Sequence, residues 1–277
     1  MRLCPLLRSI PFDPLIKLAC WLLLYLAANP AWKAKVKAEV ESLIAAHTDT
    51  TSSEPLHIRL SGIPISAWED SMPVLDACQK ETLRIVQTSA ALRRNIFEDL
   101  KIGEHVIPKG SFLVYSIADV HLNPDIYEDP FKFDPDRYAE GRGEDKKGTL
   151  SYLGWGAGRH LCSGMKVAKL EIKIVIALFL AGYEFNIVDA AGNPAKEFPR
   201  VDRNDFQQVL IIRVLYKCSF LTDNLATGKT FGRPVFHPIQ EGCWLTLTTR
   251  ACGHTIDKLE RDWTGSNLAL AYLGCCR

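Results

Sequence analysis

The sequence WGAGRHLCSG, residues 155–164, lies directly before a long apolar segment that continues to about residue 181. Cys162 therefore stands just ahead of a predicted helix, where unpaired backbone N–H groups and the helix dipole favour thiolate over thiol. Thiolate is the form of cysteine that binds metals. Gly156, Gly158 and Gly164 have no Cβ, so the backbone there can take unusual angles and let a flat cofactor approach closely. The stretch predicts a loop that presents a cysteine ligand to a metal-bearing cofactor.

An ordinary packing role for Cys162 is the alternative, because free cysteine is among the most buried residue types. The composition of residues 155–164 argues against it, since three glycines, two basic residues and an aromatic residue are poor material for a core strand. Trp155 could cover the sulfur and exclude water. Arg159 and His160 place one fixed and one titratable positive group near an acidic cofactor edge.

Residues 155–164 resemble the haem-binding loop of the cytochrome P450 family, Phe-Gly-x-Gly-x-Arg-x-Cys-x-Gly. Cys162 falls on the thiolate ligand, Trp155 replaces the phenylalanine, and His160 stands where the family has arginine. The pair Arg159-His160 bears a weaker resemblance to the fungal sterol 14-demethylase branch. The resemblance implies haem, iron protoporphyrin IX, with its iron ligated by Cys162. It also implies a set of cofactor-binding residues: Arg94, Trp155, Gly156, Gly158, His160, Cys162 and Gly164.

A second motif supports the first. Glu81 and Arg84 are three positions apart, so they share one face of a predicted helix and can pair. The family buries such a pair and adds an arginine from a Phe-x-Pro-x-Arg segment, which Arg137 supplies in residues 133–137. The resemblance implies a structural network of Glu81, Arg84 and Arg137 that holds the cofactor loop. It also makes Arg94 the arginine that reaches a haem propionate, with Arg93 as the substitute.

The fold class predicted from this resemblance is mainly α with small β-sheets, a cytochrome P450 fold truncated at its N-terminal side. Residues 1–18 are expected to be an atypical N-terminal segment, residues 19–207 the C-terminal half of the family domain, and residues 208–277 an atypical tail. The chain of 277 residues is 47% hydrophobic, which is sufficient for a sizeable core. Its net charge of +1 argues against nucleic acid as a partner.

Local patterns predict the elements around the motifs. We expect a buried helix over residues 15–28, an amphipathic helix from 31 to about 46, and further helices at about 72–87 and 165–181. A hairpin is expected at 100–102 and 105–107, followed by a strand at 111–115, and an exposed turn at 140–147. In the last helix, we expect an apolar face of Val167, Leu170, Ile174 and Leu178 and a solvated lysine stripe of Lys166, Lys169 and Lys173.

The family resemblance implies a monooxygenase that inserts one oxygen atom from O2 into an organic, lipophilic substrate and receives electrons from an NADPH-dependent flavoprotein reductase. Two alternatives stay open. One is a non-catalytic haem-binding fragment or pseudoenzyme, because residues 1–18 lack the acid-threonine pair of the oxygen-activating helix. The other is a secreted, thiol-rich protein with a relictual haem motif, cleaved near Ala28. The family implies the endoplasmic-reticulum membrane, but residues 15–28 are too short for a spanning helix of about 20 residues, so no anchor is predicted.

The tail carries five of the nine cysteines. Their spacings lack the Cys-x-x-Cys pairs of structural zinc sites, so we predict no zinc there. The tail residues considered as zinc ligands are four of these cysteines and one histidine: Cys243, Cys252, His254, Cys275 and Cys276.

Overall fold

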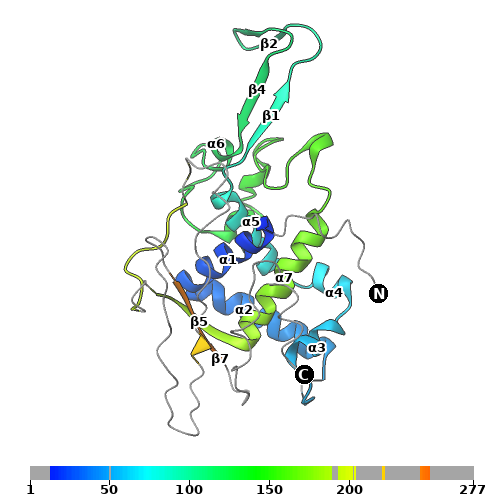
Figure 1. The fold of residues 1–277 in the computed structure, drawn as a ribbon, viewed down its shortest axis with the longest axis vertical. Coiled ribbons are helices and arrows are strands. Elements are labelled where there is room, and N and C mark those ends of the chain that lie inside the picture. Colours follow the sequence, from blue (N-terminus) through cyan, green and yellow to red (C-terminus); the bar gives the residue numbers. More distant parts are fainter. Residues whose placement is uncertain are drawn as a thin grey trace, which may run out of the picture.

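The computed structural model describes residues 13–49, 51–188, 193–201, 203, 220–221 and 244–249. The long helices α1 (Asp13–Ala28), α2 (Pro30–His47), α5 (Pro73–Val86) and α7 (Met165–Gly182) form the body of the molecule, and a thin β-hairpin projects from one end of it (Figure 1). Shorter elements connect them: α3 (Leu56–Ser61), α4 (Ile65–Asp70), α6 (Ile117–His121), and the 3-10 turns η2 (Pro135–Tyr138), η3 (Glu144–Lys146) and η4 (Gly158–His160).

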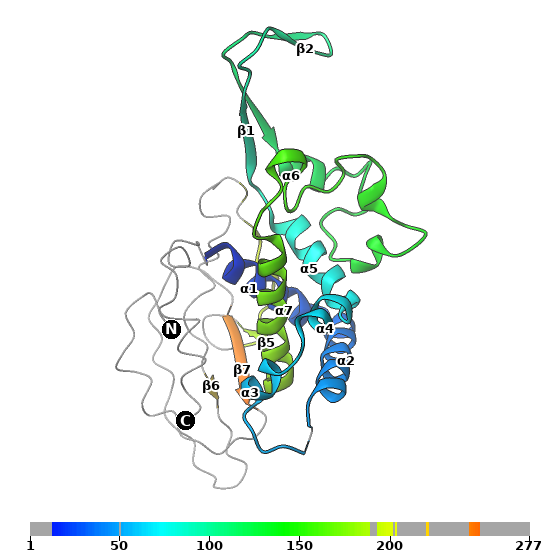
Figure 2. The ribbon, with the colours of Figure 1, turned by 90° about the vertical axis from the view of Figure 1, so that its right-hand side faces the viewer.

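Helix α1 lies at the centre of the core. Residues 18, 19 and 21–26 are all buried, and the helix contacts α2, α5, α7 and β5 (Figure 2). A helix that is apolar on every side is stable only when other elements surround it. It ends at Ala28, and Pro30 at the first position of α2 suits its fixed φ to a new helix start. The predicted buried helix and its amphipathic successor are both confirmed. Among the described residues, no helix has the length and apolar character needed to cross a membrane.

Helix α5 carries the predicted Glu81–Arg84 pair and is held at both its start and its apolar face. The Glu39 carboxylate of α2 accepts the backbone N–H groups of Val74 and Leu75, each at 2.9 Å, which satisfies two otherwise unpaired donors at the first turn. Leu75, Cys78, Ile85 and Val86 are buried against the core. This fixes the rotation of α5, so that its charged pair also points inward.

Three small sheets complete the fold. Strand β1 (Ala90–Arg94) pairs antiparallel with β4 (Phe112–Ser116), and β2 (Leu100–Ile102) pairs with β3 (His105–Ile107) at the tip of the same hairpin. The third sheet has the order β5-β7-β6, from β5 (Tyr183–Val188), β7 (Trp244–Thr249) and β6 (Phe220–Leu221). The mainly α class with small sheets and the β2–β3 hairpin are confirmed. The sequence pattern does not predict strand β1, because residues 90–94 stand out only for their two arginines.

The predicted boundaries at residues 18 and 207 are not tested by the fold. Of the predicted tail, the structure describes only β6 and β7, and residues 1–12 likewise lie outside the described part of the chain. The tail residues considered above for zinc are therefore also outside the described residues.

The predicted apolar face of α7 is wrong in part. Val167 is 58% exposed, whereas the buried row consists of Ala168, Ile172, Ile176 and Leu180, four positions apart. Residues spaced by four lie almost directly above one another on a helix, and this row faces the core. The buried face thus begins one residue later than predicted. The set of lysines that face solvent therefore also differs from the prediction.

Lys173 does not belong to a solvated stripe. It is 3% exposed, and its Nζ donates to the Trp68 carbonyl at 2.8 Å and to Asp76 Oδ2 at 2.8 Å. A buried ammonium is tolerated because a carboxylate and carbonyl oxygens replace its water. Lys173 thereby ties α7 to α4 and α5, a role that helical periodicity alone could not reveal.

Replacing Lys173 with methionine should lower the free energy of unfolding by about 1–3 kcal/mol, because the Trp68 carbonyl loses its donor while the side-chain volume is nearly kept. The matched control is Lys166→Met on the exposed side of the same helix, for which we expect a change within about 0.5 kcal/mol. Urea denaturation followed by far-UV circular dichroism measures both. Equal losses in the two variants would contradict the assigned role of Lys173.

Candidate cofactor-binding site

The loop 155–164 is held by backbone hydrogen bonds. The Cys162 N–H donates to the Trp155 carbonyl at 2.8 Å and thereby closes the loop on itself, while the Gly156 N–H donates to the Leu153 carbonyl at 2.9 Å. Inside the closure lies the short turn η4. The Cys162 carbonyl then accepts from Met165 N at 3.3 Å, at the first residue of α7. The cysteine thus follows a tight turn and leads directly into the helix, as the sequence predicts.

Two of the three glycines are needed by the backbone. Gly156 has φ +82°, and a Cβ built on it would meet the His160 carbonyl oxygen at 2.7 Å. Gly158 has φ +59°, but open space surrounds its would-be Cβ. Gly164 has an ordinary φ of −89° and also faces open space, so its backbone makes no demand for glycine. A requirement for a small residue at position 164 would therefore come from a group bound in front of the loop.

The loop exposes side chains that proteins usually bury. Residues 158–164 are all exposed, including Leu161 and the free thiol of Cys162. Free cysteine and leucine are normally among the residues most often buried. Here they stand side by side, next to the exposed basic residues Arg159 and His160. Such a surface fits a flat, apolar group that carries a soft metal and an acidic edge.

The donor set also indicates how a metal would be held. Within the ranges that the structure describes, no group of three or more His, Cys, Asp or Glu side chains lies together as a metal site would require. A metal held at Cys162 by this part of the chain would bring most of its ligands with it, as iron does in a porphyrin. The residues of the loop fit haem in this respect.

Glu81, Arg84 and Arg137 form one fully buried ionic cluster. Glu81 accepts two hydrogen bonds from Arg84 at 2.8 Å and one from Arg137 Nε at 2.9 Å, and all three side chains are 0% exposed. Glu81 also accepts from the Tyr138 hydroxyl at 2.7 Å and from the Asp134 backbone N–H at 3.1 Å. Burial first, and then the charge of Glu81, raise the pKa of Tyr138, so it stays a protonated donor. Every charge has a partner, which is what allows the cluster to survive burial.

The two arginines reach beyond Glu81 to main-chain oxygens. Arg84 donates to the His121 and Pro130 carbonyls, at 2.5 and 2.8 Å. Arg137 donates to the Glu128 and Lys132 carbonyls at 3.1 and 3.2 Å. The ring of Tyr127 lies 4.7 Å from the Arg84 guanidinium. The cluster therefore organises the whole segment between α6 and η2, which has no regular structure of its own.

Arg137 has a second carboxylate that the sequence analysis missed. Its Nη1 donates to Glu144 Oε2 at 2.5 Å, and Arg142 donates to the other oxygen of Glu144 at 2.6 Å. Glu144 is buried, so the prediction of an exposed turn over 140–147 is wrong for this residue. Burial raises the pKa of Glu144, but hydrogen bonds from Arg142 and Arg137 outweigh it and lower that pKa overall.

Arg94, the predicted propionate ligand, lies in β1 on the projecting hairpin (Figure 1). Its side chain is exposed and donates to the Gly110 carbonyl at 3.3 Å, with the guanidinium 5.4 Å from the Phe112 ring. Arg93 is also exposed and donates to the Leu92 carbonyl. These contacts stay within β1 and the hairpin that carries it. Among the described residues, neither arginine has a carboxylate partner. Their part in cofactor binding stays a prediction.

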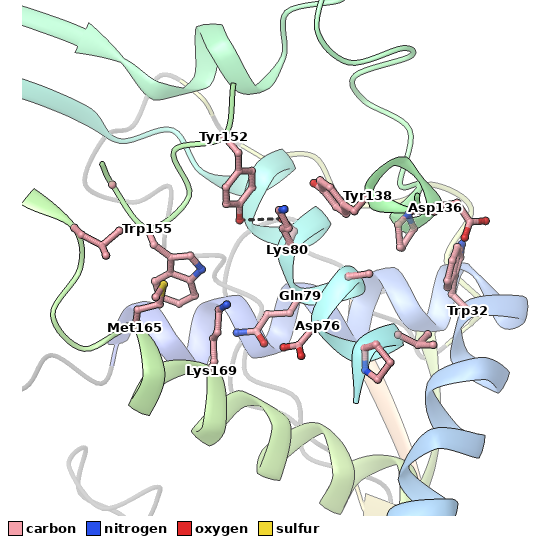
Figure 3. Close-up of a pocket in the computed structure, with 17 residues that line it drawn as sticks. Trp32, Asp76, Gln79, Lys80, Asp136, Tyr138, Tyr152, Trp155, Met165 and Lys169 are labelled. Carbon is pink, nitrogen blue, oxygen red and sulfur yellow. Dashed lines mark hydrogen bonds between the residues drawn. The ribbon is translucent and has the colours of Figure 1, made fainter. Parts of the chain in front are cut away.

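A cavity of about 770 Å³ lies beside the loop, between α2, α5, η2 and the start of α7. Figure 3 shows Trp155, Met165 and Lys169 on one side, with Asp76, Gln79 and Lys80 of α5 in the middle of the view, and the Tyr152 hydroxyl donates to the Lys80 carbonyl at 3.3 Å. Its wall combines aromatic, small apolar and charged residues, and the charges are of both signs. The aromatic and charged lining residues are Trp32, Asp76, Lys80, Asp136, Tyr138, Tyr152, Trp155 and Lys169.

Comparison with known proteins identifies the family. A model of the family described as Cytochrome P450 matches residues 17–205. The cytochrome P450 monooxygenase AacuE of Aspergillus aculeatus is 38% identical over 63% of this chain and 35% of its own length. Cytochrome P450 monooxygenase nsrP of Aspergillus novofumigatus is 37% identical over 60% of this chain and 33% of its own length. The chain thus spans about a third of the length of these relatives.

Solved structures show the same fold. The retinoic acid-bound cyanobacterial CYP120A1 has a TM-score of 0.51 with 24% identity, over 64% of this chain and 37% of that one. A zebra fish cytochrome P450 with progesterone has a TM-score of 0.50 with 22% identity, over 64% and 36% of the two chains. The resemblance of Arg159-His160 to the sterol 14-demethylase branch stays a prediction. The loop, the buried cluster and the matched residues 17–205 together place this chain in the cytochrome P450 family.

Proposed function

We propose that the chain carries the haem-binding part of a haem-thiolate monooxygenase, with Cys162 as the iron ligand, and that the enzyme inserts one oxygen atom from O2 into a lipophilic organic substrate. One observation carries the proposal: the exposed thiol of Cys162 lies between a glycine-dependent turn and the start of α7 in a member of this family.

When bound, haem supplies the redox chemistry, and a cysteine thiolate ligand favours cleavage of the O–O bond. The residues of the chain itself position the iron ligand and the loop that carries it. Cys162 offers its sulfur from a backbone fixed to Trp155, and Gly156 and Gly158 allow that backbone its turn. Trp155, His160 and Gly164 would line the cofactor, and Arg94 would bind a propionate. Glu81, Arg84 and Arg137 hold the surrounding segments and act only through them.

We assign these roles to residues 19–207 as one functional unit. The proposed electron donor is an NADPH-dependent flavoprotein reductase. It would approach the side of the loop that carries the cavity, where Lys166 is exposed and Lys169 lines the wall. Lys173 is excluded from that contact because it is buried.

Haem binding without turnover is the second candidate function, and the chain spans about a third of the length of the relatives it matches. The idea of a secreted protein cleaved near Ala28 is less well supported. Such cleavage would remove α1, whose residues 18, 19 and 21–26 belong to the buried core.

The test uses the full 277-residue chain with added haem, reduced and exposed to carbon monoxide. We expect the red-shifted Soret band of a thiolate ligand, lost in Cys162→Ala and kept in the matched control Cys20→Ala on α1. A colourless chain, or a band that Cys162→Ala leaves unchanged, would overturn the assignment. Oxygen consumption that depends on reductase and NADPH then separates turnover from binding alone.

A further inference from the structure

His121, the last residue of α6, joins the buried cluster to the segment that leads to the cofactor loop. It is fully buried. Its carbonyl oxygen accepts from Arg84 Nη1, and its ring nitrogen Nε2 accepts the Leu153 N–H at 2.9 Å. The ring also stacks on Tyr152, with centroids 5.2 Å apart and an angle of 22° between the planes. One residue therefore contacts α5 through its backbone and residues 152–153 through its side chain.

The Leu153 contact determines the protonation of the ring. A backbone N–H can donate only to a nitrogen with a free lone pair, so Nε2 must be unprotonated and the proton of the neutral ring must sit on Nδ1. Nδ1 is buried without a hydrogen-bond partner among the described residues. Burial first, and then the nearby charge of Arg84, lower the pKa of His121 to about 3, which agrees with a neutral ring.

Backbone hydrogen bonds continue from Leu153 to the cysteine. The Leu153 carbonyl accepts from Gly156 N at 2.9 Å, and the Trp155 carbonyl accepts from Cys162 N at 2.8 Å. A second anchor lies two residues before Leu153, where the Tyr127 hydroxyl donates to the Ser151 carbonyl at 2.8 Å. A series of short hydrogen bonds thus connects the Cys162 backbone to the ring of His121.

We propose that His121 is a positioning residue: its Nε2 lone pair fixes the backbone at Leu153 and so sets where Cys162 stands relative to the Glu81–Arg84–Arg137 cluster. The importance of this position for the cofactor rests on the proposed function. The hydrogen bond itself does not, since it is a property of the chain without any cofactor. If His121 only filled space, an apolar side chain of similar volume could replace it. If it positions Leu153, the replacement must also provide a hydrogen-bond acceptor.

The first test separates acceptor from volume in the full chain without haem. His121→Leu removes the acceptor, whereas His121→Gln keeps an oxygen within reach of the Leu153 N–H. Amide hydrogen exchange, read by mass spectrometry over residues 151–162, should rise roughly tenfold in His121→Leu and return towards the original rate in His121→Gln. The control Leu75→Ala disturbs the core of α5 without touching this path, and should not raise exchange selectively there. Equal exchange in the leucine and glutamine variants would overturn the proposal.

A second measurement reads the protonation of the ring in the unsubstituted chain. In the unsubstituted chain labelled with 15N-histidine, the His121 signal is identified by its absence from the His121→Gln spectrum, or by through-space contacts with Tyr152 if that variant does not fold. We expect ring nitrogen shifts of a neutral imidazole protonated on Nδ1. A ring protonated on Nε2, or a cationic ring, would overturn the proposal, because neither can accept from Leu153.

Adding haem extends the test to the cofactor. In the reduced carbon monoxide complex, His121→Leu should lose part of the thiolate-type Soret band, and His121→Gln should restore it. If the unsubstituted chain binds no haem, the proposed function fails, while exchange and tautomer still decide the role of His121. If haem binds and both variants keep the full band, the link from His121 to Cys162 is overturned although the proposed function stands.

Discussion

Replacing Arg137 with alanine should lower the free energy of unfolding by about 3–5 kcal/mol, the effect expected when one partner of a buried ion pair is removed. Arg137 is the residue between two buried carboxylates, Glu81 and Glu144. Its removal leaves Glu81 short of one donor and Glu144 with Arg142 alone. The Glu128 and Lys132 carbonyls lose their donor as well. Such a loss is a large fraction of the 5–15 kcal/mol typical of a folded protein.

Arg142→Ala is the matched control, because Arg142 shares Glu144 with Arg137 but its side chain is 37% exposed. Water can replace much of that contact, so we expect a loss of about 1 kcal/mol or less. Urea denaturation of both variants, followed by far-UV circular dichroism, measures the difference. If the two substitutions cost the same, the buried cluster does not have the stabilising role that its geometry indicates.

Gly156→Ala should have the next largest effect and should act at the cofactor loop. An alanine held at φ +82° costs about 1–2 kcal/mol, and its Cβ would meet the backbone oxygen of His160 at 2.7 Å. Backbone cannot rotate away as a flexible side chain can, so the turn must open. We expect the Cys162–Trp155 closure to weaken and haem retention to fall at least tenfold.

Gly158→Ala serves as the graded control for this prediction. Its Cβ meets open space among the described residues, so it carries only the conformational cost of its φ of +59°. Soret absorbance per chain after removal of free haem should therefore fall most in Gly156→Ala and less in Gly158→Ala. Equal retention in the Gly156 and Gly158 variants would show that the His160 contact does not control the loop.

The local patterns in the sequence were sufficient for the long helices. Apolar residues on every side of α1, Pro30 after its end, and the glycine-bracketed entry to α7 are signals within a few residues of one another. The β2–β3 hairpin follows for the same reason, with Gly103 at φ +59° in its turn. Helix α7 shows the limit of this reasoning. Periodicity placed the helix correctly, but choosing its buried face requires knowing that Lys173 meets Asp76.

The partners of the buried cluster could not be predicted from pattern alone. Glu81 and Arg84 are three residues apart, but Arg137 and Tyr138 lie 56 and 57 positions from Glu81. The resemblance supplied Arg137, and nothing supplied Tyr138, Glu144 or His121. A tyrosine, a glutamate in a polar stretch and a histidine before Asn123-Pro124 look like surface residues until the chain is folded. Their signal is burial, which only the three-dimensional structure provides.

Two of the hydrogen bonds of Arg137 go to main-chain carbonyls, so they depend on the path of the backbone and not on which side chains it carries. Glu128 and Lys132 turn their side chains to solvent while their main-chain oxygens accept from its guanidinium. Every amino acid carries the same backbone carbonyl. Substitutions at positions 128 and 132 therefore keep these hydrogen bonds as long as the path of the backbone is unchanged. The irregular segment before η2 can therefore diversify its outer surface over evolutionary time without loosening the scaffold beneath it.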